Sequence, residues 1–234
     1  MTAVFRRELK SYFVTPIGYV FLAAFYAYAG LMFYVTGLSE GKVRMDMLFS
    51  SLVIVFVMIV PILTMRTMAE ERRSKTDQCL LTSPVSVGGI VAGKFLAAFT
   101  VYLAAISITI IMALICCIYA SPDWSVVLGN FTGLALVGAA YIAVGIFCSS
   151  CTESQPVSAV LSFGVLLCVT FISSIASQLP FEFLTKLADR ISFAQRYYSF
   201  TYGLFDISNV LFFISAAFVF LFLTVRIVEK RRRS

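Results

Sequence analysis

Six long stretches without a charged residue divide this chain, and they constrain its fold more than any other feature. The stretches cover residues 11–39, 47–65, 95–122, 124–152, 154–181 and 207–225. Each is long enough for an apolar helix to cross the hydrocarbon of a bilayer, about 30 Å at about 1.5 Å per residue. Since 60% of the side chains are hydrophobic and only 13% are charged, the sequence predicts an all-α integral membrane protein with six transmembrane helices.

The basic residues predict how these helices are oriented, because cytoplasmic loops are enriched in Lys and Arg. If both termini lie in the cytoplasm, 13 of the 18 Lys and Arg residues lie on that side. The sequence therefore predicts an N-in/C-in topology. We also expect an uncleaved first helix, because the first apolar stretch is much longer than the h-region of a signal peptide.

The net charge of +6 follows from this topology and gives no reason to expect a nucleic-acid partner. The predicted six-span domain covers residues 16–226. Residues 227–234 then form a basic cytoplasmic tail that can contact anionic membrane lipid.

The six apolar stretches contain no Asp, Glu, Lys, Arg or His. Transporters driven by an ion gradient need ionisable residues within their spans to bind or relay the ion. Any active transport by this chain would therefore take its energy from another subunit.

Motifs for catalysis, nucleotide binding and metal binding are incomplete. The chain has no histidine, which excludes a Ser-His or Cys-His nucleophile, and Cys148 with Cys151 lacks the second ligand pair of a zinc site. Residues 88–94 match G-x-x-x-x-G-K, but Phe95 stands where a P-loop requires Ser or Thr. Lys94 is better explained as a snorkelling residue where a helix enters the bilayer. We predict a non-catalytic subunit with no cofactor or metal site of its own.

Residues 1–15 have the pattern of an amphipathic helix. Apolar residues recur at i, i+4, i+7 and i+8 from Phe5, and basic residues gather on the other side. Such a helix lies along the membrane surface, either as an anchor alone or also as a brace for a cytoplasmic partner. The candidate interface residues are Phe5, Arg6, Arg7, Leu9 and Lys10.

Residues 66–94 connect the second and third spans and place opposite charges at helical spacing, which favours a helix that extends the second span. The pairs are Glu71 with Lys75, Arg73 with Asp77 and Glu70 with Arg73. Ser83 and Pro84 predict the start of a second helix, so that Leu80 and Leu81 lie at the corner of a cytoplasmic elbow. This apolar pair either inserts into a cleft of another protein or dips into the lipid interface.

On the outer side, residues 178–206 interleave aromatic and charged side chains and predict short helices at or in the outer leaflet. The aromatic residues form either an interfacial belt or the gate of a translocation path. The candidate gate residues are Tyr197, Tyr198 and Phe200.

Two further features concern helix packing. Gly129 and Gly133 form a G-x-x-x-G pattern, which predicts a close helix contact within the subunit. Pro61 lies near the inner end of the second span and predicts a bend or a loosened helix there.

Four segments in order along the chain resemble permease subunits of the ABC-2 type of ATP-binding cassette transporter, most closely the gliding-motility branch. They are FRRELKSYFVTPIGYVFLAAFYAYAGLMF, PILTMRTMAEERRSKTDQCLLTSPVSVGGIVAGKFLAA, GIFCSSCTESQPVSAVLSFGVLL and YYSFTYGLFDISNVLFFISAAFVFLFLTVRIVEKRR. The resemblance covers nearly the whole chain.

The resemblance implies a half-transporter in the bacterial plasma membrane that works in export. It pairs with a second permease, identical or related, and each permease docks on a separate ATPase subunit that holds ATP and magnesium. It also implies a translocation path lined mainly by the first, second and fifth spans, and a coupling helix in the first cytoplasmic loop. The implied ATPase-coupling residues are Glu70, Glu71, Arg72, Arg73, Thr76, Leu80, Leu81 and Pro84.

The long aromatic outer loop leaves a second function open. In that alternative, the complex moves no cargo and transmits force or a signal to an extracytoplasmic accessory protein. A passive channel or scaffold without an ATPase is the third hypothesis considered.

Overall fold

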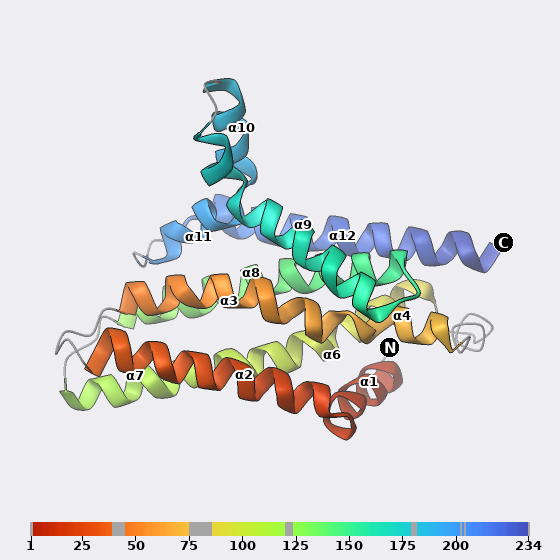
Figure 1. Ribbon diagram of the computed structural model, residues 1–234, viewed down its shortest axis with the longest axis horizontal. Coiled ribbons are helices and arrows are strands. Elements are labelled where there is room, and N and C mark those ends of the chain that lie inside the picture. The colour runs from red at the N-terminus through yellow and green to blue at the C-terminus, as the bar shows by residue number, and fades with distance from the viewer. Residues whose placement is uncertain are drawn as a thin grey trace.

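The computed structural model describes residues 2–38, 45–74, 86–119, 124–178, 182–201, 203 and 205–233, and it is helical almost throughout this part of the chain (Figure 1). The helices are α1 (Thr2–Val14), α2 (Pro16–Phe33), α3 (Met45–Thr64), α4 (Arg66–Arg73), α6 (Val87–Ile106), α7 (Ile108–Tyr119), α8 (Trp124–Cys151), α9 (Gln155–Ala176), α10 (Glu182–Ile191), α11 (Phe193–Thr201) and α12 (Ile207–Arg233). A short π-helix, η1 (Tyr34–Leu38), follows α2.

Six segments in the described part of the chain are long and apolar enough to cross a membrane, which confirms the predicted number of spans. They are Pro16–Thr36, Met47–Arg73, Val87–Cys117, Trp124–Cys151, Gln155–Ala176 and Ile207–Arg231. The second combines α3 with α4, and the third combines α6 with α7.

The spans divide into central and peripheral helices. In the most apolar window of each span, 61% of the α3–α4 residues and 67% of the α8 residues are buried, against 22% for α2, 22% for α9 and 17% for α12. The helices α3 and α8 therefore form the centre, and α2, α9 and α12 are peripheral, with residues that are mostly half-buried or exposed.

Aromatic side chains fill the space between the central helices where a neighbouring helix has a glycine. A Cβ atom at Gly138 of α8 would lie 2.1 Å from the Tyr102 ring of α6, so only glycine leaves room for this ring. The Tyr102 hydroxyl donates to the carbonyl oxygen of Leu134 at 2.8 Å, and its ring packs against Phe56 of α3. This contact joins three helices in the core.

The second span is interrupted after Pro61, as predicted: α3 ends at Thr64 and α4 begins at Arg66. The break packs tightly against α8, because a Cβ atom at Gly145 would lie 2.2 Å from the Thr64 hydroxyl oxygen. A second break, between α6 and α7 at Ser107, has no proline and was not predicted.

The bundle has two ends of different composition (Figure 1). At the α1 end lie α1, α4, the turn between α8 and α9, and the last turns of α12. At the α11 end, α11 packs on α8, and α10 stands off the bundle beside the end of α9. The predicted corner residues Leu80 and Leu81, with Thr76 and Pro84, lie outside the described residues.

Candidate functional site

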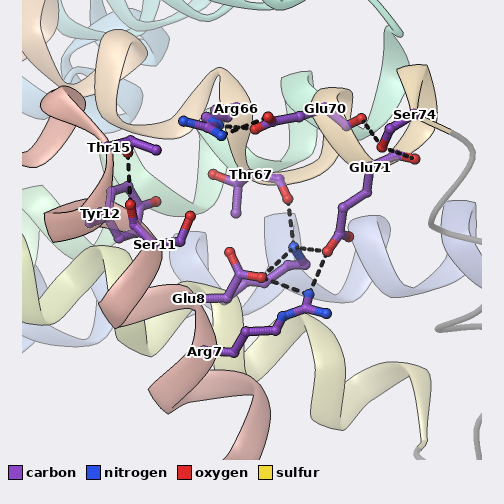
Figure 2. A pocket seen from close by; sticks show the side chains of 11 residues that line it. Arg7, Glu8, Ser11, Tyr12, Thr15, Arg66, Thr67, Glu70, Glu71 and Ser74 are labelled. Atoms are coloured by element: carbon purple, nitrogen blue, oxygen red, sulfur yellow. Dashed lines mark hydrogen bonds and ion pairs between the residues drawn. The ribbon is translucent and has the colours of Figure 1, made fainter.

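A polar cavity of about 340 Å³ lies between α1 and α4 at the α1 end (Figure 2). Three basic, three acidic and five hydroxyl side chains line it: Arg7, Arg66, Lys94, Glu8, Glu70, Glu71, Ser11, Tyr12, Thr15, Thr67 and Ser74. This lining places most of the charges of α1 and α4 close to one another.

Lys94 of α6 is the most buried charged group of this cavity, since its side chain is 1% exposed. Its ammonium lies 3.1 Å from Glu8 Oε1, 2.9 Å from Glu71 Oε1 and 2.7 Å from the carbonyl oxygen of Thr67. The prediction that Lys94 snorkels to the membrane surface is therefore wrong. A snorkelling lysine extends along its own helix until its ammonium reaches water. Here α1 and α4 cover the start of α6, and their acceptors bind the ammonium inside the protein.

Arg7 completes the arrangement from the side of solvent. Its Nη2 atom lies 2.9 Å from Glu8 Oε1 and 2.6 Å from Glu71 Oε1, the same two oxygens that contact Lys94. The four atoms form a closed square of alternating charge, and Figure 2 shows Arg7 and Glu8 of α1 facing Glu71 of α4. The hydrogen bond to Glu8 raises the pKa of the Arg7 guanidinium, with a further contribution from Glu71, so Arg7 stays charged.

The position of α1 is set by its junction with α2. The chain turns at Thr15, and a Cβ atom at Gly18 would lie 2.5 Å from the carbonyl oxygen of Tyr12, so glycine permits the two helices to meet closely. Tyr12 is buried, and its hydroxyl donates to the carbonyl oxygen of Leu63 at 3.2 Å. Burial raises the pKa of this hydroxyl, which keeps it a neutral donor that ties α1 to the end of α3.

On its other side, α4 is held by the end of α8. The Ser149 hydroxyl accepts from the backbone N–H groups of Met68 and Ala69, both at 3.1 Å, and donates to the carbonyl oxygen of Met65 at 3.0 Å. One serine thus satisfies backbone groups left free where α3 gives way to α4.

Two further contacts close this side. Arg72 pairs with Glu153 in the turn between α8 and α9 at 2.7 Å. Arg231 of the basic tail donates to the carbonyl oxygen of Ser150 at 2.6 Å. The last turn of α8 and the residues just after it therefore contact both α4 and α12.

The structure brings some of the predicted coupling residues together in a way the sequence did not indicate. Glu71 reaches Arg7 and Lys94 on other helices, and Glu70 pairs with Arg66 within α4 in place of the predicted Arg73. Arg73 is exposed. The other predicted partners, Lys75 and Asp77, lie outside the described residues.

A helix is present over the predicted residues, as α1, and its role as an interface helix stays a prediction. Phe5 and Leu9 are half-buried and pack against the core, whereas Arg6 and Lys10 are exposed. Its acidic residue Glu8 was missed, although a carboxylate among three basic residues is a signal for an ion pair outside the helix.

The three predicted gate residues differ in their burial. Tyr197 and Phe200 are buried against α8. A Cβ atom at Gly133 would lie 2.9 Å from Phe200 and 3.0 Å from Tyr197, and one at Gly129 would lie 3.0 Å from the Cα atom of Gly203. Tyr198 is 54% exposed. The predicted G-x-x-x-G contact is confirmed as a contact within the subunit.

The α11 end carries its own polar network, centred on Arg196. Its Nε atom donates to the carbonyl oxygen of Arg190 at 2.8 Å, and Nη1 donates to Asn209 Oδ1 at 3.0 Å. The guanidinium also lies over the Phe212 ring, 4.1 Å from its centroid. Arg196 thereby joins α10, α11 and α12. Nearby, the Tyr197 hydroxyl donates to Asn130 of α8 at 2.9 Å.

No group of three His, Cys, Asp or Glu side chains in the described ranges could hold a metal ion. Comparison with curated proteins finds no match to this chain. The model of one protein family, described as ABC-2 family transporter protein, matches residues 11–228.

This match includes five spans in full, the sixth as far as Val228, and the α4 part of the cavity. The family is a membrane component that works with ABC ATPase subunits, which makes this chain a multi-pass membrane protein and a permease subunit of an ABC transporter. The chain belongs to the ABC-2 family of transporter proteins.

Proposed function

We propose that this chain is an export permease of the bacterial plasma membrane, with both termini in the cytoplasm, that converts ATP-driven motion of separate ATPase subunits into alternating access. ATP and magnesium bind in those ATPases. The observation that carries the proposal is the ion-pair square, because α4 leads directly into the predicted coupling segment and is joined there to α1 and α6.

The distribution of charge supports this division of labour. Nearly all charges in the described spans lie at their α1 ends, and the middle of the bundle holds none that could bind a driving ion. Motion that enters at residues 75–85 would pass through α4 to α3 across the break at Met65, and to α1 across the square. Rocking of helices about such a break is an established type of transition.

The peripheral helices support a second permease copy, identical or related. Only 22% of the residues in the most apolar windows of α2 and α9 are buried, and these are two of the spans expected to line the path. Between two permeases, these surfaces would enclose a route for an amphipathic cargo.

The experiment is recovery of an ATPase with the tagged chain from its native membrane. We expect a P-loop ATPase to copurify with the wild type. Replacing Leu80 and Leu81 with alanine should abolish its recovery, because the predicted contact loses its apolar pair. The matched control replaces Leu114 and Ile115, an exposed apolar pair on α7, and should retain the ATPase.

Absence of any ATPase in the wild-type preparation would refute the proposed function. Equal recovery with the variant at Leu80 and Leu81 would refute only the coupling site.

The alternative, transmission of force to an outer protein, is favoured by one observation. The helix α10 stands off the bundle (Figure 1) and presents exposed Asp189 and Arg190. Cross-linking from Arg190 in intact cells tests it, since this function requires a captured extracytoplasmic protein. Transport of a cargo by the purified complex alone would exclude it.

A further inference from the structure

We infer that Lys94 is a positioning residue that makes α1, α4 and the first turns of α6 move as one unit, so that displacement of α4 is passed to α1 without loss. The inference rests on the proposed function for its role in transport. Its structural content, one rigid unit built on a buried lysine, can be tested without an ATPase.

The hydrogen bonds of the ammonium group give the first step. A lysine ammonium has three N–H donors and no acceptor. Lys94 has three acceptors within 3.1 Å, from Glu8 of α1, from Glu71 of α4 and from the backbone of α4 at Thr67. Two of these contacts are hydrogen bonds, to Glu8 and to the Thr67 carbonyl oxygen, and the third is an ion pair with Glu71. Both helices thus supply partners to one buried charge, and neither can move away without removing one of them.

Burial gives the second step. The Lys94 side chain is 1% exposed, and the Glu8 and Glu71 side chains are 15% and 17% exposed. Water cannot easily replace a partner that leaves, and breaking one side of a buried ion pair is strongly unfavourable. Arg7 bridges the same two carboxylates, so the relative position of α1 and α4 is fixed twice.

The third step is the backbone contact. Because Lys94 binds the carbonyl oxygen of Thr67 as well as a side chain of α4, it fixes the orientation of this helix and not only its distance. The junctions at Met65 and Thr15 are held by neutral hydrogen bonds, from the Ser149 hydroxyl to the carbonyl oxygen of Met65 and from the Thr15 hydroxyl to the carbonyl oxygen of Ser11. The ion pair near Met65, Arg72 with Glu153, is largely exposed at Glu153 and contributes little. Neutral hydrogen bonds contribute less than charged ones, so angular change between the unit and the membrane spans occurs at Met65 and Thr15.

The experiment measures distances between spin labels on the full chain in lipid nanodiscs, in a background from which the six native cysteines have been removed. One pair of labels replaces Arg6 of α1 and Arg73 of α4, which are exposed. We expect one narrow distance peak in the otherwise unchanged chain, and loss of that peak in favour of a broad distribution in Lys94→Met. Lys10→Met, an exposed lysine on α1, is the matched control and should keep the narrow peak.

A second pair, at Arg73 and at exposed Met58 of α3, spans the junction at Met65. With the copurified ATPase, addition of ATP and vanadate should shift this distance and leave the distance between Arg6 and Arg73 unchanged. A narrow Arg6–Arg73 peak in Lys94→Met, or a nucleotide-dependent shift of that pair in the background chain, would overturn the inference.

A second variant and a separate readout distinguish the possible outcomes. If Lys94→Met fails to insert, Glu8→Gln removes the charge of one partner while keeping the size of its side chain, and broadening is again expected. The label distances in nanodiscs, measured on the chain without an ATPase, test only whether α1, α4 and the first turns of α6 form a rigid unit. Absence of an ATPase in the native preparation tests only the proposed function.

Discussion

Each end of the bundle is held by one basic side chain that joins three helices, but the partners differ. At the α1 end, Lys94 binds two carboxylates and a carbonyl oxygen. At the α11 end, Arg196 binds a carbonyl oxygen, an amide oxygen and an aromatic face. The difference follows from exposure, since Lys94 is buried and Arg196 is half-buried.

The two ends are therefore stabilised by different kinds of interaction. A buried ammonium is stable only when opposite charge compensates its lost hydration, whereas a guanidinium that keeps some contact with water is satisfied by neutral acceptors and by a ring face. The α1 end therefore depends on ionised groups, and the α11 end on close packing. Four variants test this contrast.

Lys94→Met should have the largest effect. It leaves two largely buried carboxylates with Arg7 as their remaining partner in the square, and breaking a buried ion pair costs about 3–5 kcal/mol. The measurement is the midpoint of thermal unfolding in detergent micelles, compared with Lys10→Met. An unchanged midpoint would show that the α1 end does not depend on charge.

Gly133→Ala should destabilise the α11 end by about 1–3 kcal/mol, the usual cost of overpacking. The added Cβ atom would lie 2.9 Å from Phe200 and 3.0 Å from Tyr197. The matched control is Gly164→Ala on α9, which meets nothing within 4 Å. Protease cleavage between α10 and α12 reports local opening, and equal cleavage of the two variants would contradict close packing as the source of strength.

Arg196→Met should cost about 1–2 kcal/mol, the sum of its neutral hydrogen bonds and the contact with Phe212. The same unfolding assay applies, with Arg190→Met as a control because the Arg190 side chain is exposed. The contrast between the ends requires a smaller loss here than for Lys94→Met. A loss of equal size would end that contrast.

Glu153→Gln should have the smallest effect, at most about 1 kcal/mol, because exposed ion pairs contribute little. Its partner Arg72 is 18% exposed, but Glu153 itself is 68% exposed. The difference from wild type should vanish in high salt, where exposed charges are screened. A difference in stability that persists in high salt would show that this pair is shielded from solvent in the same way as the ion-pair square.

The sequence predicted the fold well because the controlling signals are local. Charge-free stretches give the spans, Pro61 gives the break in the second span, and the apolar spacing from Phe5 gives α1. The short helices between the fifth and sixth spans, α10 and α11, were also expected. Each of these depends on residues within a few turns of one another.

The candidate site was only partly predictable because its partners are far apart in sequence. Helical periodicity shows which face of α6 carries Lys94 but not that Glu8, 86 residues earlier, lies against it. The same applies to Ser149, which binds backbone groups about 80 residues away. The function of the predicted corner at Leu80 and Leu81 stays a prediction.

The separation of Glu8 and Lys94 has a consequence for biogenesis. A ribosome that adds 5–20 residues per second makes the intervening chain in roughly 4–17 s. During this interval α1 has left the ribosome but has no lysine to bind, and when the third span enters the bilayer its ammonium needs those carboxylates at once. Glu8 is synthesised before Lys94, so a helix that is made earlier supplies a partner for the buried lysine of one that is made later.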